Sequence, residues 1–212
     1  FIIATSYNVQ GRLKKYLHVE APVLHPPINN KQFHSGESHG YWLSINRLIS
    51  HKRVDVQLEA FRSLPHENLI VVGSHEQSAH FLKYAQYLKN IRPDNVTIRR
   101  WVPHHELQDL YAHCKGFITT SLDEDFGLTP LEAMASGKYV IAPDEGGYKE
   151  TVIHGKTGYL LPAVTPDDLV RAIRSFNMHD LSYTEQCIKR ASEFDIEPFI
   201  KSLTQMIRDY VK

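Results

Sequence analysis

The chain has 212 residues, with 24 Lys or Arg and 24 Asp or Glu, so its formal net charge is zero. This balance removes the net positive charge expected of a general nucleic-acid binder, although it is compatible with a local basic patch. The hydrophobic content of 42% indicates a globular chain, and the length favours one large domain or one domain with an extension. No apolar run approaches the ~18 residues that cross a bilayer. Two isolated cysteines, Cys114 and Cys187, are typical of a reducing cytosol.

The first 30 residues differ in pattern from the rest. The apolar opening Phe1–Thr5 follows no initiator Met and no basic region, so we expect a β-strand from a longer protein rather than a signal peptide. A basic helix is predicted over 11–16, followed by a linker that contains three prolines, Pro22, Pro26 and Pro27.

From residue 41 onward, short apolar runs alternate with amphipathic stretches. Strands are predicted at 41–45, 69–72, 96–101, 117–119, 139–142 and 159–161. Apolar residues at helical spacing predict three of the intervening helices: Val54, Leu58 and Phe61; Phe81, Tyr84 and Leu88; and Leu107, Leu110 and Tyr111. A further helix is predicted over 130–136. The next begins over 165–168, where an N-cap, a proline and two acids follow one another. This order predicts an α/β fold, a Rossmann-like doubly wound parallel sheet with helices on both faces. Ligands of such sheets bind at the C-terminal ends of the strands.

A final helix is predicted from residue 196. Its apolar stripe comprises Ile196, Phe199, Ile200, Leu203, Ile207 and Tyr210. The stripe has two interpretations, docking on the domain's own core or packing on an absent partner domain.

The loop and helix over 121–137 are the densest candidate site. We expect the helix to begin at Pro130, and its free amide groups and dipole to favour a phosphate. Gly127 permits close backbone approach. Glu124 and Glu132 lie eight residues apart and could border one ligand, because carboxylates accept hydrogen bonds from hydroxyls. Solvated surface is the alternative for both glutamates.

Two further loops follow strands. In the loop over 45–53, Arg47 and Lys52 could converge on a diphosphate, although solvated surface is again an alternative. The loop Asp144–Gly147 leads to Glu150, and its paired glycines suit either ligand contact or a simple turn. The 13 histidines show no HxxxH or HExxH spacing, so no metal site is predicted, and GxGxxG and GxxxxGK[ST] motifs are absent.

These loops together resemble the C-terminal, donor-binding half of a retaining glycosyltransferase with the GT-B fold, the group 1 or family-four class. Residues 124–137 match its E-x7-E motif within E-x-F-G-L-x-P-L-E-A-M-A-x-G, and Arg47 and Lys52 match its G-R-L-x-x-x-K-G element. Asn46 and Arg53 stand where that element usually has glycine. Stretches 146–150 and 155–158 resemble G-G-x-x-E and G-x-T-G.

The resemblance implies a role for each matching position. Arg47 and Lys52 would neutralise the diphosphate leaving group, and Glu132 would bind the ribose. Glu124 and the amides of Phe126, Gly127 and Leu128 would hold the donor sugar, with the Leu128 and Thr129 amides near the β-phosphate. The loop at Trp101 and Val102 would take the base through backbone contacts. The resemblance implies no cofactor and no metal, because fixed cations and a helix end would stabilise the leaving diphosphate. The donor substrate would be a GDP- or UDP-linked sugar.

The resemblance also implies a domain plan. Residues 1–30 would be the remnant of an acceptor domain plus the interdomain linker, 31–195 the nucleotide-sugar-binding domain, and 196–212 a helix that packs toward the missing domain. The expected partners are a nucleotide sugar and, through that domain, a glycan or lipid-linked acceptor, with no nucleic acid. Dimers through the exposed interdomain surface are a further option. The expected location is cytoplasmic, and the inner face of the membrane is an alternative for the full-length protein.

Three functions remain open at this point. The first is the donor half of a hexosyltransferase, with mannose as a candidate sugar. The second is a non-catalytic nucleotide-sugar-binding module on the same scaffold. The third is an unrelated Rossmann-type dehydrogenase or interaction module, which the missing glycine fingerprint disfavours.

Overall fold

The computed structural model describes residues 2–74, 79–176 and 182–211. Within them, one sheet has six strands in the order β3-β2-β1-β4-β5-β6, and every neighbouring pair is parallel. This is the order of a doubly wound dinucleotide-binding fold, which reverses direction between β1 and β4. The strands are β1 (Tyr41–Ile45), β2 (Asn68–Val72), β3 (Val96–Arg99), β4 (Gly116–Ile118), β5 (Val140–Pro143) and β6 (Gly158–Leu161).

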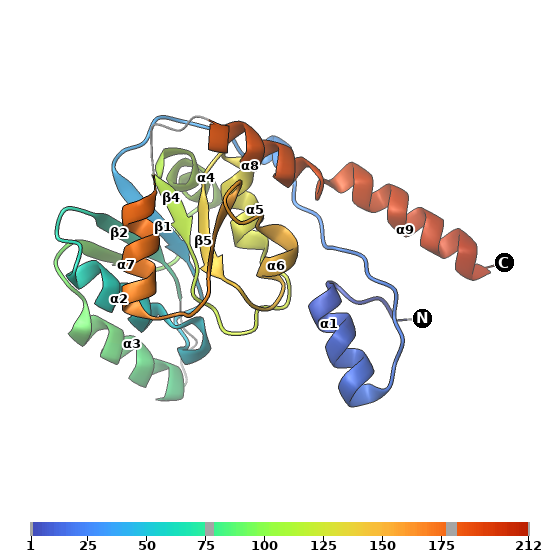
Figure 1. Cartoon of the computed structure of the whole chain (residues 1–212), viewed down its shortest axis with the longest axis horizontal. Coiled ribbons are helices and arrows are strands. Elements are labelled where there is room, and N and C mark those ends of the chain that lie inside the picture. Colours follow the sequence, from blue (N-terminus) through green and yellow to red (C-terminus); the bar gives the residue numbers. More distant parts are fainter. Residues whose placement is uncertain (1, 75–78, 177–181, 212) are drawn as a thin grey trace.

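Helices cover both faces of the sheet (Figure 1). The α-helices are α1 (Tyr7–Arg12), α2 (Val54–Arg62), α3 (Ala79–Ile91), α4 (His104–His113), α5 (Leu128–Ala135), α6 (Tyr148–Thr151), α7 (Pro166–Ser175), α8 (Ser182–Ser192) and α9 (Ile196–Val211). A π-helix, Leu13–Leu17, continues α1, and short 3-10 turns lie at Asn30–Gln32 and Ser50–Lys52.

Two buried clusters hold the layers together. The first joins α2, α3 and α7 to one face of the sheet, with Leu58, Phe61 and Ile173 among its members. The second joins α4, α5 and α8 to the other face through residues such as Leu131 and Met134. Because both faces are covered, the strands are almost uniformly apolar, as is typical of parallel sheets.

The predicted α/β fold is confirmed, and the observed strands lie close to their predicted positions. Strand β3 ends at Arg99, so Trp101 lies in the following loop. Thr165 caps α7 as expected, because its hydroxyl accepts a hydrogen bond from the Asp168 amide at 3.1 Å. Helix α5 begins at Leu128 rather than Pro130. Pro130 fits in this first turn, where an amide N–H has no intrahelical acceptor.

The N-terminal segment departs from the prediction. Its opening residues form no strand, since only Ala4 pairs, in an isolated bridge with Val23. The helix expected over 11–16 begins instead at Tyr7, because Ser6 caps it by accepting a hydrogen bond from the Val9 amide. Phe1 lies outside the described residues.

Helix α9 does not dock on the sheet. It extends away from the sheet in Figure 1, and Ile200 and Ile207 are each about half exposed, at 54% and 51%. The interpretation in which its stripe packs on the domain's own core is therefore wrong. A cavity of about 200 Å³ separates its first turns from residues 23–25. No described helix is long and apolar enough to cross a membrane.

Candidate functional site

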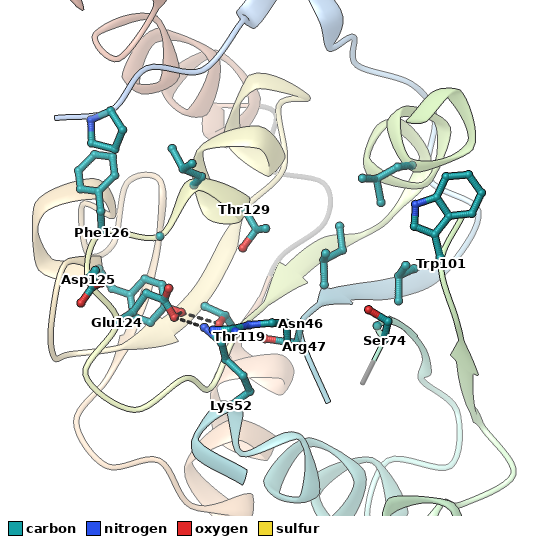
Figure 2. Close-up of a pocket in the computed structure, with 18 of the residues that line it drawn as sticks. Asn46, Arg47, Lys52, Ser74, Trp101, Thr119, Glu124, Asp125, Phe126 and Thr129 are labelled. Atoms are coloured by element: carbon teal, nitrogen blue, oxygen red, sulfur yellow. Dashed lines mark hydrogen bonds and ion pairs between the residues drawn. The ribbon is translucent and has the colours of Figure 1, made fainter. Parts of the chain in front are cut away.

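A pocket of about 600 Å³ lies at the C-terminal ends of the strands (Figure 2). Among the residues to which the resemblance gives a role, all except Glu132 line it, whereas Gly146, Gly147 and Glu150 of the β5 loop do not. The pocket thus brings together loops that follow β1, β3 and β4. The predicted residues that line the pocket are Arg47, Lys52, Trp101, Val102, Glu124, Phe126, Gly127, Leu128 and Thr129. The expectation that ligand-binding loops meet at this edge of a parallel sheet agrees with this arrangement.

The loop after β1 supplies the cations of the pocket. Arg47 is exposed, whereas the Lys52 side chain is 14% exposed and ends a 3-10 turn. The pKa of the nearby His51 is lowered, first by burial and then by the positive charges of Lys52 and Arg47. This side of the pocket therefore suits an anion.

Glu124 faces these cations from the loop after β4. Its Oε2 lies 2.5 Å from Lys52 Nζ, a contact drawn in Figure 2. Burial opposes ionisation of Glu124, but the hydrogen bond and charge of Lys52, together with hydrogen bonds from Ser121 and Tyr148, outweigh it, so the carboxyl pKa is lowered. Glu124 is therefore an anionic acceptor, and Lys52 can contact both this carboxylate and a bound phosphate.

Tyr148 contacts Glu124 and was not predicted as a site residue from the sequence. Its ring is 2% exposed, its hydroxyl lies 2.8 Å from Thr119 Oγ1, and it donates to Glu124 Oε2 at 3.4 Å. The hydroxyl thus offers Glu124 a second hydrogen-bond partner besides Lys52. The only sequence signal was its place directly after Gly147 at the end of a strand loop.

Gly127 connects Glu124 to the start of α5. It has a φ of +88°, which favours glycine, and a Cβ here would lie 2.7 Å from Tyr148 Cε1. The following residues, Leu128 and Thr129, form the first helical turn, whose amide groups have no intrahelical acceptor. The pocket therefore combines a helix N-terminus with the cations of the β1 loop.

The two non-glycine residues of the β1 loop are accommodated differently. Asn46 is buried, and its side-chain amide donates to Ser44 Oγ at 2.6 Å. Arg53 adopts the left-handed conformation usual for glycine, with a φ of +49°. Its guanidinium donates to the Thr120 carbonyl at 2.7 Å and pairs with Glu145 at 2.5 Å, which ties the β1, β4 and β5 loops together.

The paired glycines of the β5 loop lie in a turn, which is one of their two predicted purposes, while contact with a ligand stays a prediction. They allow the 144–147 loop to pack on the backbone of the Glu124 loop, and the Gly147 amide donates to the Glu124 carbonyl at 2.7 Å. A Cβ on Gly147 would lie 2.3 Å from Phe126 Cα. The glycines therefore fix the backbone of Glu124 through close packing and this hydrogen bond.

The other end of the pocket is formed by the loop after β3. Trp101 is 77% exposed and lies opposite Glu124 in Figure 2. Val102 and Leu107 pack against the buried cluster and line the pocket wall. This end offers a flat aromatic ring and apolar surface to a planar group.

Glu132 lies deeper than predicted. It is not among the residues that line the pocket, and its Oε2 accepts a hydrogen bond from the buried Tyr111 hydroxyl at 2.6 Å. Burial raises the pKa of Glu132, and the hydrogen bond from Tyr111 offsets part of this effect. Glu132 follows Leu128 by one helical turn, so it lies on the same face of α5 as a pocket-lining residue.

Phe126 contributes to both core and site. It is 3% exposed and stacks on His25, with ring centroids 5.0 Å apart. Over the described ranges, no group of three or more His, Cys, Asp or Glu side chains is arranged to hold a metal ion.

Known proteins resemble this chain in sequence. The family model "Glycosyl transferases group 1" matches residues 27–194. The α-1,3/1,6-mannosyltransferase ALG2 of Dictyostelium discoideum is 27% identical over 92% of this chain and 56% of its own length. The O-antigen chain mannosyltransferase RfbU of Salmonella typhimurium is 27% identical over 79% of this chain and 47% of its own. The chain thus spans about half the length of these curated relatives.

Solved structures share the fold. Sucrose-phosphate synthase from Thermosynechococcus elongatus has a TM-score of 0.86 at 22% identity, over 99% of this chain and 58% of that protein. Anabaena HepE, solved with UDP and glucose, has a TM-score of 0.83 at 19% identity, over 98% and 62%. The sheet is thus the Rossmann-like half of a GT-B fold. With a family model that covers 27–194 and the E-x7-E loop at the pocket, the chain belongs to the group 1 glycosyltransferases.

Proposed function

We propose that this chain is the donor-binding half of a retaining hexosyltransferase that takes its sugar from a nucleoside diphosphate. The observation that carries the proposal is the shared pocket of Arg47, Lys52, Glu124 and the first turn of α5. Cations and helix amides favour a diphosphate, whereas the carboxylate favours sugar hydroxyls. One extended ligand with both groups satisfies the whole arrangement.

In this proposal the sugar, the diphosphate and the base of the donor follow one another along the pocket. Arg47, Lys52 and the Leu128 and Thr129 amides bind the diphosphate, with Glu124 and the 126–128 amides on the sugar side. The base occupies the opposite end, at Trp101 and Val102. Glu132 reaches the ribose from the next turn of α5, with Tyr111 holding its other side.

The chemistry follows from the charge that develops on the leaving diphosphate. Fixed cations and a helix N-terminus stabilise this charge as the sugar–phosphate bond breaks. We propose on this basis that binding needs no divalent cation. That the sugar keeps its anomeric configuration is proposed from the resemblance to the retaining class, not from this charge. Mannose is the favoured sugar, because two of the relatives are mannosyltransferases. HepE was solved with UDP and glucose, which keeps a UDP-linked donor open.

The acceptor belongs to the remainder of the enzyme in this proposal. The chain spans about half of its curated relatives, and transfer requires a second wall that orders the acceptor and excludes water. A glycan or a lipid-linked sugar is the proposed acceptor class. We expect no transfer by the 212 residues alone.

A thermal-shift screen against GDP-, UDP- and ADP-sugars tests donor binding. A ligand that binds only the folded state at about 100 times its Kd stabilises it by roughly 2.7 kcal/mol. We expect one nucleotide series to raise the Tm and EDTA to leave the rise unchanged. No rise with any series would contradict the proposal, and loss of the rise in EDTA would contradict its metal-free form.

A further inference from the structure

The N-terminal segment contacts the loop that carries Glu124. This segment precedes the family match, which begins at residue 27. The Ser6 side chain is fully buried, and its hydroxyl donates to the Asp125 carbonyl at 2.5 Å. At the other end of α1, six residues after Ser6, Arg12 forms an ion pair with the Asp125 carboxylate and lies 3.7 Å from that of Asp123. Ser6 and Arg12, at the two ends of α1, thus both bond to Asp125 of the site loop.

Asn8 bonds to two residues of the same loop, Asp123 and Glu124. Its side-chain amide donates to Asp123 Oδ1 at 3.0 Å and to the Glu124 carbonyl at 3.3 Å. Asp123 has a φ of +41°, a left-handed conformation that non-glycine residues rarely adopt and that needs support from its surroundings. Asn8 and Gly147 therefore hold the Glu124 carbonyl between them.

Glu150 fixes α1 in this position. Its two carboxylate oxygens accept hydrogen bonds from the Tyr7 and Asn8 amides, both at 2.9 Å, and His25 Nε2 lies 2.9 Å from Oε2. A carboxylate at a helix N-terminus interacts favourably with the helix dipole. Helix α1 is thus attached to the domain at its start by Glu150 and along its length by the site loop.

We propose that Asn8 and Arg12 are positioning residues for the donor sugar, which act through the loop 123–126 to hold Glu124 against Lys52. This inference rests on the proposed function, because Glu124 contacts the sugar only there. Neither residue lines the pocket, and their side chains bond to Asp123, Asp125 and the Glu124 carbonyl, so they would act on the donor through this loop. The predicted consequence is specific: loss of either residue weakens sugar recognition and spares the nucleotide.

The test compares the affinity of a bare nucleoside diphosphate with that of its sugar conjugate in the 212-residue chain. Calorimetry with GDP and GDP-mannose, and with UDP and UDP-glucose, gives the factor by which the sugar improves binding. In Asn8→Ala and Arg12→Ala we expect this factor to fall about threefold to thirtyfold, the range of one or two lost hydrogen bonds. The Kd of the bare nucleotide should stay within about twofold of wild type, and Arg12→Lys should restore part of the loss.

Lys14→Ala is the matched control. Lys14 lies on the same segment, and the ion pair it makes is with the exposed Glu20 at 2.6 Å, away from the site loop. It should leave both affinities unchanged. Equal weakening of nucleotide and nucleotide sugar in the Asn8 and Arg12 variants, or wild-type affinities in both, would overturn the inference. If wild type binds none of these four ligands and no ADP-sugar, the proposed function fails instead.

Discussion

The Lys52–Glu124 ion pair offers the sharpest test of the site, through Lys52→Met. Both side chains are under a quarter exposed, and 2.5 Å separates Nζ from Oε2. A hydrogen bond between Lys52 and a phosphate is worth about 1.5–3 kcal/mol. Because Lys52 already contacts Glu124 in the unliganded protein, the net loss should lie near the lower value. This corresponds to a roughly tenfold weaker Kd for a nucleoside diphosphate.

The substitution should also change the stability of the fold. The lost pair lies between exposed pairs, worth up to about 1 kcal/mol, and fully buried ones, whose rupture costs about 3–5 kcal/mol. Lys52 lowers the pKa of Glu124, so the stability from this pair is present above the pKa of an unfolded glutamate. It is lost as the pH falls through the lowered pKa of the folded state. The deficit of Lys52→Met should therefore be largest near neutral pH and shrink in acid.

Lys115→Met separates the two effects. Lys115 pairs with Glu67 at 2.6 Å with similar exposure, 17% and 26%, but it precedes β4 and so lies at the opposite edge of the sheet. Thermal unfolding of Lys115→Met should show a loss of stability comparable to that of Lys52→Met, and calorimetric titration should show an unchanged nucleotide affinity. Wild-type affinity in Lys52→Met, or an equal loss in both variants, would refute the assignment of Lys52 to the diphosphate.

Three further outcomes follow from the same site. Glu132→Ala should weaken a bare nucleoside diphosphate and its sugar conjugate alike, by about 1.5–3 kcal/mol, whereas Glu124→Ala should weaken only the conjugate; equal loss of bare-nucleotide binding in both, measured by calorimetry, would refute this division. Burial raises the pKa of Glu132, so its ionised form destabilises the fold above that pKa. Glu132→Gln should therefore raise the Tm at about pH 8, by about 2–4 °C for each kcal/mol gained, and this difference from wild type should disappear in acid. Tyr148→Phe should reduce the affinity gained from the sugar about threefold to tenfold through Glu124, whereas Tyr111→Phe, measured in the same titrations, should affect the bare nucleotide instead.

The sheet was predictable because its strands are buried on both faces and form continuous apolar runs. Helix α8 was not predicted, since the buried residues of this segment are Cys187 and Ala191, which are too small to form a recognisable apolar stripe. The opening apolar residues suggested a strand, but strand formation depends on a partner, and only Ala4 has one.

The candidate site divides along similar lines. Arg47, Lys52 and Glu124 were predictable because they follow strands, and parallel topology brings such loops together. Tyr148 and Asn8 were not, because their roles depend on how separate loops pack in three dimensions. Glu150 matched a family motif, yet its two oxygens bind the start of α1, a segment about 140 residues earlier in sequence.

Position 53 carries an evolutionary consequence. The left-handed backbone at Arg53 favours glycine by about 1–2 kcal/mol, while the guanidinium joins three loops of the pocket. A change to glycine would relax the backbone but release the Thr120 carbonyl and Glu145. The fitness effect of that single step therefore depends on whether another residue already anchors these loops.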